Sequence, residues 1–407
     1  MRTLRFHTMH SGALNASPER PPSRGLTIIV AGMIAGDPYQ GGATWAVLQY
    51  VLGLRQLGHD AYFIEPVEAD KLQPRDTSLS NSTNAAYFRA VMRQFDLESH
   101  AALVLDGTTQ TVGLPYERLR TVAAESDCLI NISGMLADPA LTEPVPVRVY
   151  LDLDPGFNQL WHAAEGLDVG WDGHTHFVTI GLALGETACD IPTCGRTWIA
   201  TRQPVVLSEW PRAERLTHDA FTTVANWRGY GSITYKSVFY GQKAHAWRGL
   251  MSLPDKTSEP LVVALAIHPD EQRDLALLNA HGWKLVDPAG VSDTPDRYRA
   301  FVQGSKGEIG VAKSGYAASR CGWFSDRSVC YLASGRPVVA QETGFSRFLP
   351  TGEGLFAFET SDEACAGIDA VVRDYARHSR TARAIAEEYF DASSVLPQLL
   401  ERVGVDG

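Results

Sequence analysis

The segment from Ser319 to Phe358 places a cation beside the expected start of a helix. A glycine-bearing loop leads into a helix that we expect to begin at Ser325 or Asp326, with Arg327 in its first turn. Backbone N–H groups at a helix N-terminus attract anions, and an arginine forms charged hydrogen bonds to phosphate. Lys313 closes an expected strand, and an open α/β sheet binds its ligands at the carboxyl ends of its strands. These residues together predict a site for a diphosphate.

Two carboxylates stand at the end of another expected strand, at Asp152 and Asp154. Residues i and i+2 of a strand face the same side, and such a pair can ligate a divalent cation that carries a nucleotide diphosphate. A strand that ends in Pro-Gly is also an ordinary start of a loop. We therefore expect no metal here, and we take Asp154 as a candidate catalytic carboxylate on the acceptor side.

His174 and His176 also share one face of an expected strand, and Cys189 and Cys194 follow them. Zinc could use these four side chains, but the spacing is loose, and we expect no zinc. A histidine near a strand terminus that faces a cleft suits a general base that deprotonates a hydroxyl group. His174 and His176 are therefore candidate catalytic bases, and a hydrogen-bonded structural role is the alternative.

Gly41 and Gly42 open a helix directly after the first expected strand. A helix N-terminus of this kind can hold an anion, so the pair is a candidate loop on the acceptor side. The loop is not G-x-G-x-x-G, and no Walker lysine follows it. The alternative is that the glycines only allow the helix to pack closely.

The length and charge of the chain limit the classes of protein that it can be. With 407 residues, two domains are expected rather than one. The net charge of -11 leads us to expect no nucleic-acid partner. Six cysteines without a C-x-x-C pair read as reduced thiols, no apolar run is long enough to span a membrane, and we expect a cytoplasmic protein. Residues 1–24 read as a disordered leader.

Strands and helices alternate along the chain in two successive arrays. The first has expected strands at 26–33, 60–66, 101–106, 128–134, 147–155 and 174–181, with helices at 43–58, 85–95 and 116–126. The second has expected strands at 221–227, 261–267, 283–288, 308–313, 336–341 and 354–358, with helices at 243–254, 270–282, 295–305 and 326–335. This alternation is typical of parallel α/β sheets. We therefore predict two Rossmann-like domains, at residues 25–210 and 211–407.

The segment 319–358 resembles the donor-binding half of the GT-B glycosyltransferases. Those proteins share a loop of small residues, a helix that ends in A-S-G, a strand that begins x-P-V-V, and a glycine loop beside the sugar. The matching pieces here are Gly322 to Arg327, Ala333-Ser334-Gly335, Arg336 to Ala340, and Glu342 to Gly344. The resemblance implies that Ser325, Asp326 and Arg327 lie at the donor, with Glu342, Thr343 and Gly344 near its sugar.

The same superfamily commonly has an arginine and a lysine after the first strand of its C-terminal domain, both of which reach the donor phosphates. Arg228 and Lys243 look like these two residues, and the alternative is that both are surface charges. Many retaining members carry two glutamates around the donor helix, where this chain has Gly322 and Cys330. The resemblance is therefore to the superfamily, and it leaves the subfamily and the stereochemical outcome open.

From these observations we expect an α/β protein of GT-B type, with two Rossmann-like domains that face each other across a cleft. Its expected activity is the transfer of a sugar from a nucleotide-sugar donor to a small-molecule or glycan acceptor, without a metal or a separate cofactor. One alternative is a nucleotide-sugar epimerase on the same fold. Another is a non-catalytic protein that binds a carbohydrate or a nucleotide.

Overall fold

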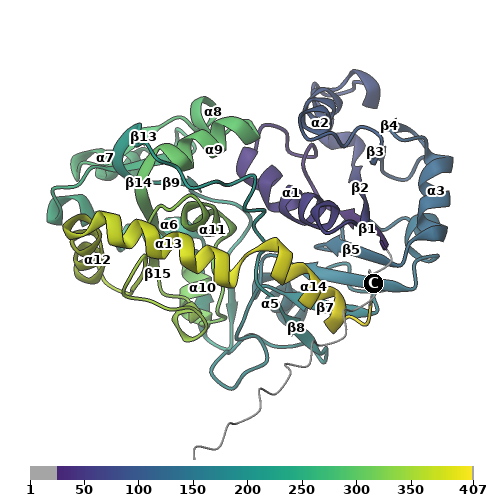
Figure 1. The fold of residues 1–407 in the computed structure, drawn as a ribbon. Helices are drawn as coiled ribbons and strands as arrows, with labels where there is room; N and C mark the ends of the chain where they lie inside the picture. The colour runs from purple at the N-terminus through teal and green to yellow at the C-terminus, as the bar shows by residue number, and fades with distance from the viewer. Residues whose placement is uncertain (1–24, 406–407) are drawn as a thin grey trace, which may run out of the picture.

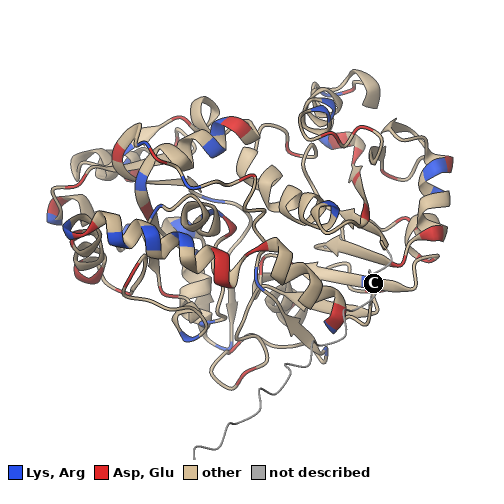
Figure 2. Ribbon diagram, in the orientation of Figure 1, with Lys and Arg blue, Asp and Glu red and all other residues tan. Residues whose placement is uncertain are grey.

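The computed structural model describes residues 25–405, so the predicted leader lies outside the described residues. Figure 1 shows two α/β halves side by side, each built on its own sheet. Within the described residues, no helix is both long and apolar enough to cross a membrane. Acidic and basic residues are interspersed over both halves (Figure 2).

The first half contains an eight-stranded sheet in the order β4-β3-β2-β1-β5-β6-β7-β8. Neighbouring strands are parallel except β3 and β4, which are antiparallel. The strand at its centre is a β-branched apolar run with four of five residues buried, as expected where helices cover both faces of a sheet. The eight strands are β1 (Thr27–Ala31), β2 (Asp60–Val67), β3 (Ala101–Leu105), β4 (Thr111–Gly113), β5 (Cys128–Ile132), β6 (Val147–Asp152), β7 (His176–Thr179) and β8 (Trp198–Ala200).

The second half contains a six-stranded parallel sheet in the order β13-β12-β9-β14-β15-β16, and a small hairpin, β10-β11. These strands are β9 (His218–Asn226), β10 (Ile233–Tyr235), β11 (Val238–Tyr240), β12 (Leu261–Ala266), β13 (Lys284–Val286), β14 (Ser305–Gly310), β15 (Val338–Gln341) and β16 (Leu355–Phe358). The strand order reverses between β1 and β5 in the first sheet and between β9 and β14 in the second. Open α/β sheets form their ligand crevices at such points, outside the carboxyl ends of the strands.

Helices connect the strands and cover the sheets. In the first half they are α1 (Gly41–Gln56), α2 (Thr83–Gln94), α3 (Tyr116–Glu125), α4 (Pro139–Thr142) and α5 (Phe157–Glu165). The later helices are α6 (Lys243–Arg248), α7 (Gln272–Ala280), α8 (Pro288–Val291), α9 (Pro295–Gly304), α10 (Ser314–Ser319), α11 (Asp326–Ala333), α12 (Ser361–Arg373), α13 (Tyr375–Tyr389) and α14 (Ala392–Arg402). Four short 3-10 helices are η1 (Ala69–Lys71), η2 (Leu79–Asn81), η3 (Leu253–Lys256) and η4 (Phe345–Arg347).

The end of the chain returns to the first half. Figure 1 shows α13 running across the second half toward α14, and α14 packs against α1. Leu396 of α14 lies against Gly53 of α1, where a side chain larger than hydrogen would collide with it. The two α/β halves confirm the predicted fold class, whereas the division at residue 210 stays a prediction.

A second contact joins the N-terminus of α1 to the other half. The Gly41 N–H donates to the carbonyl oxygen of Ser292 at 2.8 Å, and the Trp45 indole N–H donates to the carbonyl oxygen of Pro295 at 2.9 Å. A Cβ atom on Gly41 would lie 2.7 Å from the Ser292 oxygen and closer still to that of Thr294. Gly41 is therefore required for close packing between the halves, which was the alternative to its role as an acceptor-side loop.

We predict that Gly41→Ala destabilises the protein by about 1–3 kcal/mol, because both obstructing atoms belong to backbone that cannot rotate away. At an unobstructed helix position the same change would stabilise the protein, because alanine is a better helix former than glycine. A loss of stability would therefore indicate a steric clash. Urea unfolding followed by circular dichroism measures the change. Gly290→Ala is the matched control, because a Cβ atom there would meet nothing within 4 Å. An unchanged stability for Gly41→Ala would contradict the close contact between α1 and the second half.

Candidate functional site

A cavity of about 370 Å³ lies where the two halves meet, and we call it the inter-sheet cavity. Its walls come from the carboxyl end of β9, the loop after β14, the first turns of α6 and α11, and the N-terminus of α1. Five of the residues singled out from the sequence line it: Gly42, Lys243, Lys313, Asp326 and Arg327. The cavity thus brings three predicted cations together at the switch point of the second sheet.

Lys243 is the cation without an anionic partner. It is the first residue of α6, and no hydrogen bond or ion pair to its ammonium group is formed by the described residues. Burial, together with the nearby charges of Arg327 and Lys313, lowers the pKa of Lys243 to about 7. An ammonium group in this position gains most from an anion that enters the cavity, because the anion would offset both the burial and the repulsion.

Arg327 is held by the protein itself. Its guanidinium group forms a 2.5 Å ion pair with the fully buried Glu308 and donates to the carbonyl oxygen of Val224 at 3.1 Å. The side chain is only 9% exposed. Arg327 therefore acts mainly as a fixed positive charge in the cavity wall, with less freedom to reach a ligand than the sequence analysis expected.

Lys313 links the two halves. Its ammonium group donates to both carboxylate oxygens of Asp154, at 2.9 and 3.1 Å, and to the hydroxyl group of Tyr230. The ring centres of Tyr230 and Phe157 lie 3.9 and 4.9 Å from the ammonium nitrogen, within the range of cation–π attraction. Tyr316 also donates its hydroxyl hydrogen to Asp154. Asp154, a predicted catalytic residue, is therefore paired with Lys313, a predicted donor-binding residue.

The carboxylates of Asp152 and Asp154 have different partners. Asp152 is buried and accepts hydrogen bonds from the side chains of Gln159 and Thr179, at 2.8 and 3.0 Å. Burial raises the pKa of Asp152 to about 6. These contacts fix the loop that carries Asp154. Within residues 25–405, no group of three or more potential metal ligands is found.

The two histidines proposed as bases lie away from the inter-sheet cavity. The ring nitrogens of His174 lie 3.0 Å from the Asn131 side-chain amide and 3.2 Å from the carbonyl oxygen of Trp171. His176 is the first residue of β7, so it enters at the amino end of its strand, whereas Asp154 follows the carboxyl end of β6. The hydrogen bonds of His174 fit the structural role that was its alternative, while a catalytic role for His174, His176 or Asp154 stays a prediction.

The remaining predicted donor residues do not line the inter-sheet cavity. Arg228 pairs with Glu271 at the surface, and Ser325 precedes the first turn of α11. Glu342, Thr343 and Gly344 form a loop that is bound to the segment before α11. Gly344 has a φ of 94°, and a Cβ atom there would lie 2.6 Å from the carbonyl oxygen of Arg320. This loop supports α11 in the structure, and its proposed contact with a sugar stays a prediction.

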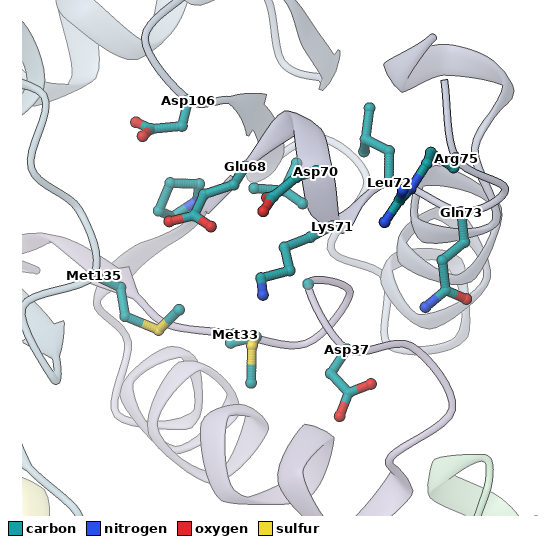
Figure 3. Close-up of a pocket in the computed structure, with 13 residues that line it drawn as sticks. Met33, Asp37, Glu68, Asp70, Lys71, Leu72, Gln73, Arg75, Asp106 and Met135 are labelled. Carbon is teal, nitrogen blue, oxygen red and sulfur yellow. The ribbon is translucent and has the colours of Figure 1, made fainter. Parts of the chain in front are cut away.

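A second and larger cavity, of about 790 Å³, was missed by the sequence analysis. This first-sheet cavity lies at the carboxyl ends of β1, β2, β3 and β5, at the switch point of the first sheet. Figure 3 shows the carboxylates of Glu68 and Asp70 beside the ammonium group of Lys71, with Met33 and Met135 across from them. Its carboxylates belong to Asp37, Glu68, Asp70 and Asp106. The signal in the sequence was an acidic residue directly after two strands, at Glu68 and Asp106.

One loop connects the two cavities. Gly36 lines the first-sheet cavity and Gly42 lines the inter-sheet cavity, and the buried carboxylate of Glu65 anchors the loop that leads from one to the other. Glu65 accepts hydrogen bonds from the N–H groups of Ile34, Ala35 and Gly36 at 2.6 to 3.0 Å. Burial raises the pKa of Glu65 to about 8. The position of the loop between the cavities therefore depends on one buried side chain.

No family model and no curated protein sequence matches this chain. Its structure is similar to that of an α-glucosyltransferase in complex with UDP and a 13-mer DNA, with a TM-score of 0.58, 11% identity, and coverage of 93% of this chain and 100% of the other. HepE from Anabaena, in complex with UDP and glucose, has a TM-score of 0.55, 12% identity and coverage of 93% and 99%. A glycosyltransferase from Rickettsia africae ESF-5 has a TM-score of 0.50, 12% identity and coverage of 93% and 98%.

These similar structures contradict our expectation that nucleic acid is not a partner. Four of the solved structures similar to this chain, all of them α-glucosyltransferases, are complexes with DNA. The expectation was wrong because the net charge of -11 describes the whole chain, whereas a nucleic-acid substrate meets only a local surface. The protein has two largely parallel sheets of Rossmann-like strand order with a cavity between them, and its structure is similar to the α-glucosyltransferase over 93% of the chain. Together these observations show that the protein has the fold of the GT-B glycosyltransferase superfamily.

Proposed function

We propose that the protein is a nucleotide-sugar-dependent glycosyltransferase whose donor diphosphate binds in the inter-sheet cavity. The observation that carries this proposal is the unpaired ammonium group of Lys243, which lies beside the charges of Lys313 and Arg327 in that cavity. A half-buried cation without a partner among residues 25–405 is costly, and a diphosphate offers the compensating negative charge. The UDP present in the similar structures makes UDP the first nucleotide to test.

In the proposed reaction, a hydroxyl oxygen of the acceptor attacks the anomeric carbon of the donor sugar. The bond from that carbon to the diphosphate oxygen breaks, and its electron pair leaves with the diphosphate. Lys243 and Lys313 stabilise the charge that develops on the leaving group, with Arg327 as a fixed charge behind them. Asp154 would take the proton of the acceptor hydroxyl group, because among the predicted bases it is the one that is hydrogen-bonded to Lys313, which lines this cavity.

We further propose that the acceptor binds in the first-sheet cavity. Its four carboxylates can accept hydrogen bonds from the hydroxyl or amino groups of a sugar, and Met33 and Met135 offer apolar surface to a ring face. The loop anchored by Glu65 separates this cavity from the donor, so the two substrates would approach each other across it.

Turnover of UDP-glucose with and without acceptors tests the proposed function against its alternatives. A transferase consumes the donor in the presence of an acceptor and forms a new glycoside, whereas an epimerase changes the sugar without an acceptor. A binding protein does neither. The acceptor panel should contain monosaccharides, amino sugars, oligosaccharides and a DNA duplex, and it should be repeated with other UDP-sugars.

We predict that Lys243→Met weakens the binding of UDP about ten- to a hundredfold, because a charged hydrogen bond to phosphate contributes about 1.5–3 kcal/mol. The affinity for uridine should change much less, since uridine carries no phosphate. Isothermal titration calorimetry measures both ligands, and Lys284→Met, at an exposed position of β13, is the matched control. Equal affinity of Lys243→Met and the parent for UDP would show that the diphosphate lies elsewhere.

We also predict that Lys243→Met makes the ligand-free protein more stable at pH 6. The pKa of Lys243, about 7 in the folded protein, is below the ordinary lysine value of 10.5, so the ammonium group opposes folding at pH values below about 7. Between pH 7 and 10.5, Lys243 is largely neutral in the folded protein but still protonated in the unfolded chain. The destabilisation caused by Lys243 therefore decreases as the pH rises through this range. The difference between variant and parent should therefore be smaller at pH 9.

Urea unfolding at pH 6 and pH 9 measures these stabilities. Lys313→Met is the contrasting variant, and it should destabilise the protein because it leaves the carboxylate of Asp154 buried without its cation. A loss of stability in Lys243→Met at pH 6 would mean that its ammonium group has a partner in the protein.

A further inference from the structure

The ammonium group of Lys313 can bind either the carboxylate of Asp154 or an anion in the inter-sheet cavity. Asp154 follows β6 in the first half, and Lys313 follows β14 in the second, so the pair forms where the carboxyl ends of the two sheets meet. The same Lys313 lines the inter-sheet cavity together with Lys243 and Arg327. A ligand in that cavity and the carboxylate of Asp154 therefore compete for the same cation.

On the basis of the proposed function, we propose that binding of the donor diphosphate draws Lys313 away from Asp154 and thereby frees Asp154 to act as the catalytic base. The structure in the absence of a ligand would then hold the base inactive, and the donor itself would release it. Productive binding follows an order as a consequence, with the donor before the acceptor.

The charges favour the transfer of Lys313 to the donor. A diphosphate carries more negative charge than one carboxylate, and it would bind against two further cations that Asp154 does not contact. The rings of Tyr230, Phe157 and Tyr316, at 3.9 to 5.2 Å from the ammonium nitrogen, attract it independently of its anionic partner. A short movement of the Lys313 side chain can therefore exchange the carboxylate of Asp154 for the diphosphate. The ammonium group stays in contact with the faces of the aromatic rings throughout this movement.

The release also strengthens the base. Burial raises the pKa of Asp154, and the charge of Lys313 acts in the opposite direction. When Lys313 moves to the diphosphate, the lowering influence weakens and the burial remains, so the carboxylate binds a proton more readily. The groups that then remain beside Asp154 are the hydroxyl group of Tyr316, which donates to its carboxylate, and the carboxylate of Asp152, which accepts a hydrogen bond from the Asp154 backbone N–H.

The chemical step balances without another reactant. The freed carboxylate of Asp154 takes the proton from the acceptor hydroxyl group as the acceptor oxygen bonds to the anomeric carbon. The bond from that carbon to the diphosphate breaks, and its electron pair remains on the diphosphate, which Lys313 and Lys243 now hold. A displacement of this kind inverts the configuration at the anomeric carbon, which NMR of the product measures.

A double-mutant cycle with UDP tests the competition. Asp154→Asn should bind UDP about tenfold more tightly than the parent, because Lys313 no longer has to leave a carboxylate. Lys313→Met should bind UDP about tenfold more weakly, and Asp154→Asn should have no further effect in the Lys313→Met background. Asp190→Asn is the matched control: it removes an exposed carboxylate of the first half that does not pair with Lys313, so it should leave the affinity for UDP unchanged.

Each outcome of the cycle is decisive. If Asp154→Asn binds UDP no more tightly than the parent, or tightens it equally in the Lys313→Met background, the competition is refuted. Uridine affinity and thermal stability show whether each variant is folded. The parent protein provides a test that needs no variant: in its crystal structure with UDP, Lys313 should contact the diphosphate and no longer contact Asp154.

The failure of this inference can be distinguished from the failure of the proposed function. If neither UDP nor another nucleoside diphosphate binds the parent protein, the proposed function fails and this inference fails with it. If UDP binds and depends on Lys243, but the pair of Lys313 and Asp154 persists in the complex, only the inference fails. Transfer activity adds a further readout, because Asp154→Asn should lose most of its turnover while it binds the donor more tightly.

Discussion

Three cations converge on one cavity where the two sheets meet, and the residues around the cavity must offset their mutual repulsion. Lys243, Lys313 and Arg327 all line the inter-sheet cavity, in a chain that is otherwise acidic. Glu308 offsets the charge of Arg327 from within the second sheet, and Asp154 offsets that of Lys313 from the first half. The third charge, that of Lys243, has no anionic partner among residues 25–405, and a stable fold tolerates this best where a ligand supplies the missing anion.

The contacts between the halves explain how such a cavity can exist. The N-terminus of α1 reaches the backbone before α9 so closely that only a glycine fits at residue 41, and α14 returns from the second half to cover α1. Hydrogen bonds from Gly41 and Trp45 to carbonyl oxygens of the second half fix this approach. The walls of the cavity therefore come from segments that are distant in the sequence but held by backbone contacts.

The fold and part of the site could be predicted from local patterns. Buried apolar strands and helices with glycine stops are local signals, and they were sufficient for the two sheets. A cation at a strand end and a cation beside a helix start pointed to Lys313 and Arg327, whereas Lys243 was proposed from the resemblance to the GT-B glycosyltransferases. Partners remote in sequence gave no such signal. Glu308 lies 19 residues before Arg327, and Asp154 lies 159 residues before Lys313, so the sequence alone could not show that these two cations are already paired.

Some strands and site residues could not be predicted from the sequence, for several physical reasons. The hairpin β10-β11 and the three-residue strand β8 are too short to show a clear hydrophobic period. His176 was placed on a strand correctly, whereas His174 lies in the turn before it. The direction of the sheet relative to the cavity puts both residues at the amino end of β7, away from the cavity. The first-sheet cavity depends on the strand order, since its carboxylates come from loops after different strands.

The return of α14 to α1 has a consequence for the synthesis of this protein. Translation delivers the first sheet and α1 early, but the helix that covers α1 is encoded at residues 392–402. Until those residues leave the ribosome, the apolar face of α1 around Gly53 has no cover, and the first half cannot complete its core. The nascent chain therefore carries an unfinished hydrophobic surface during the synthesis of residues 57–391, the whole stretch between α1 and the helix that covers it.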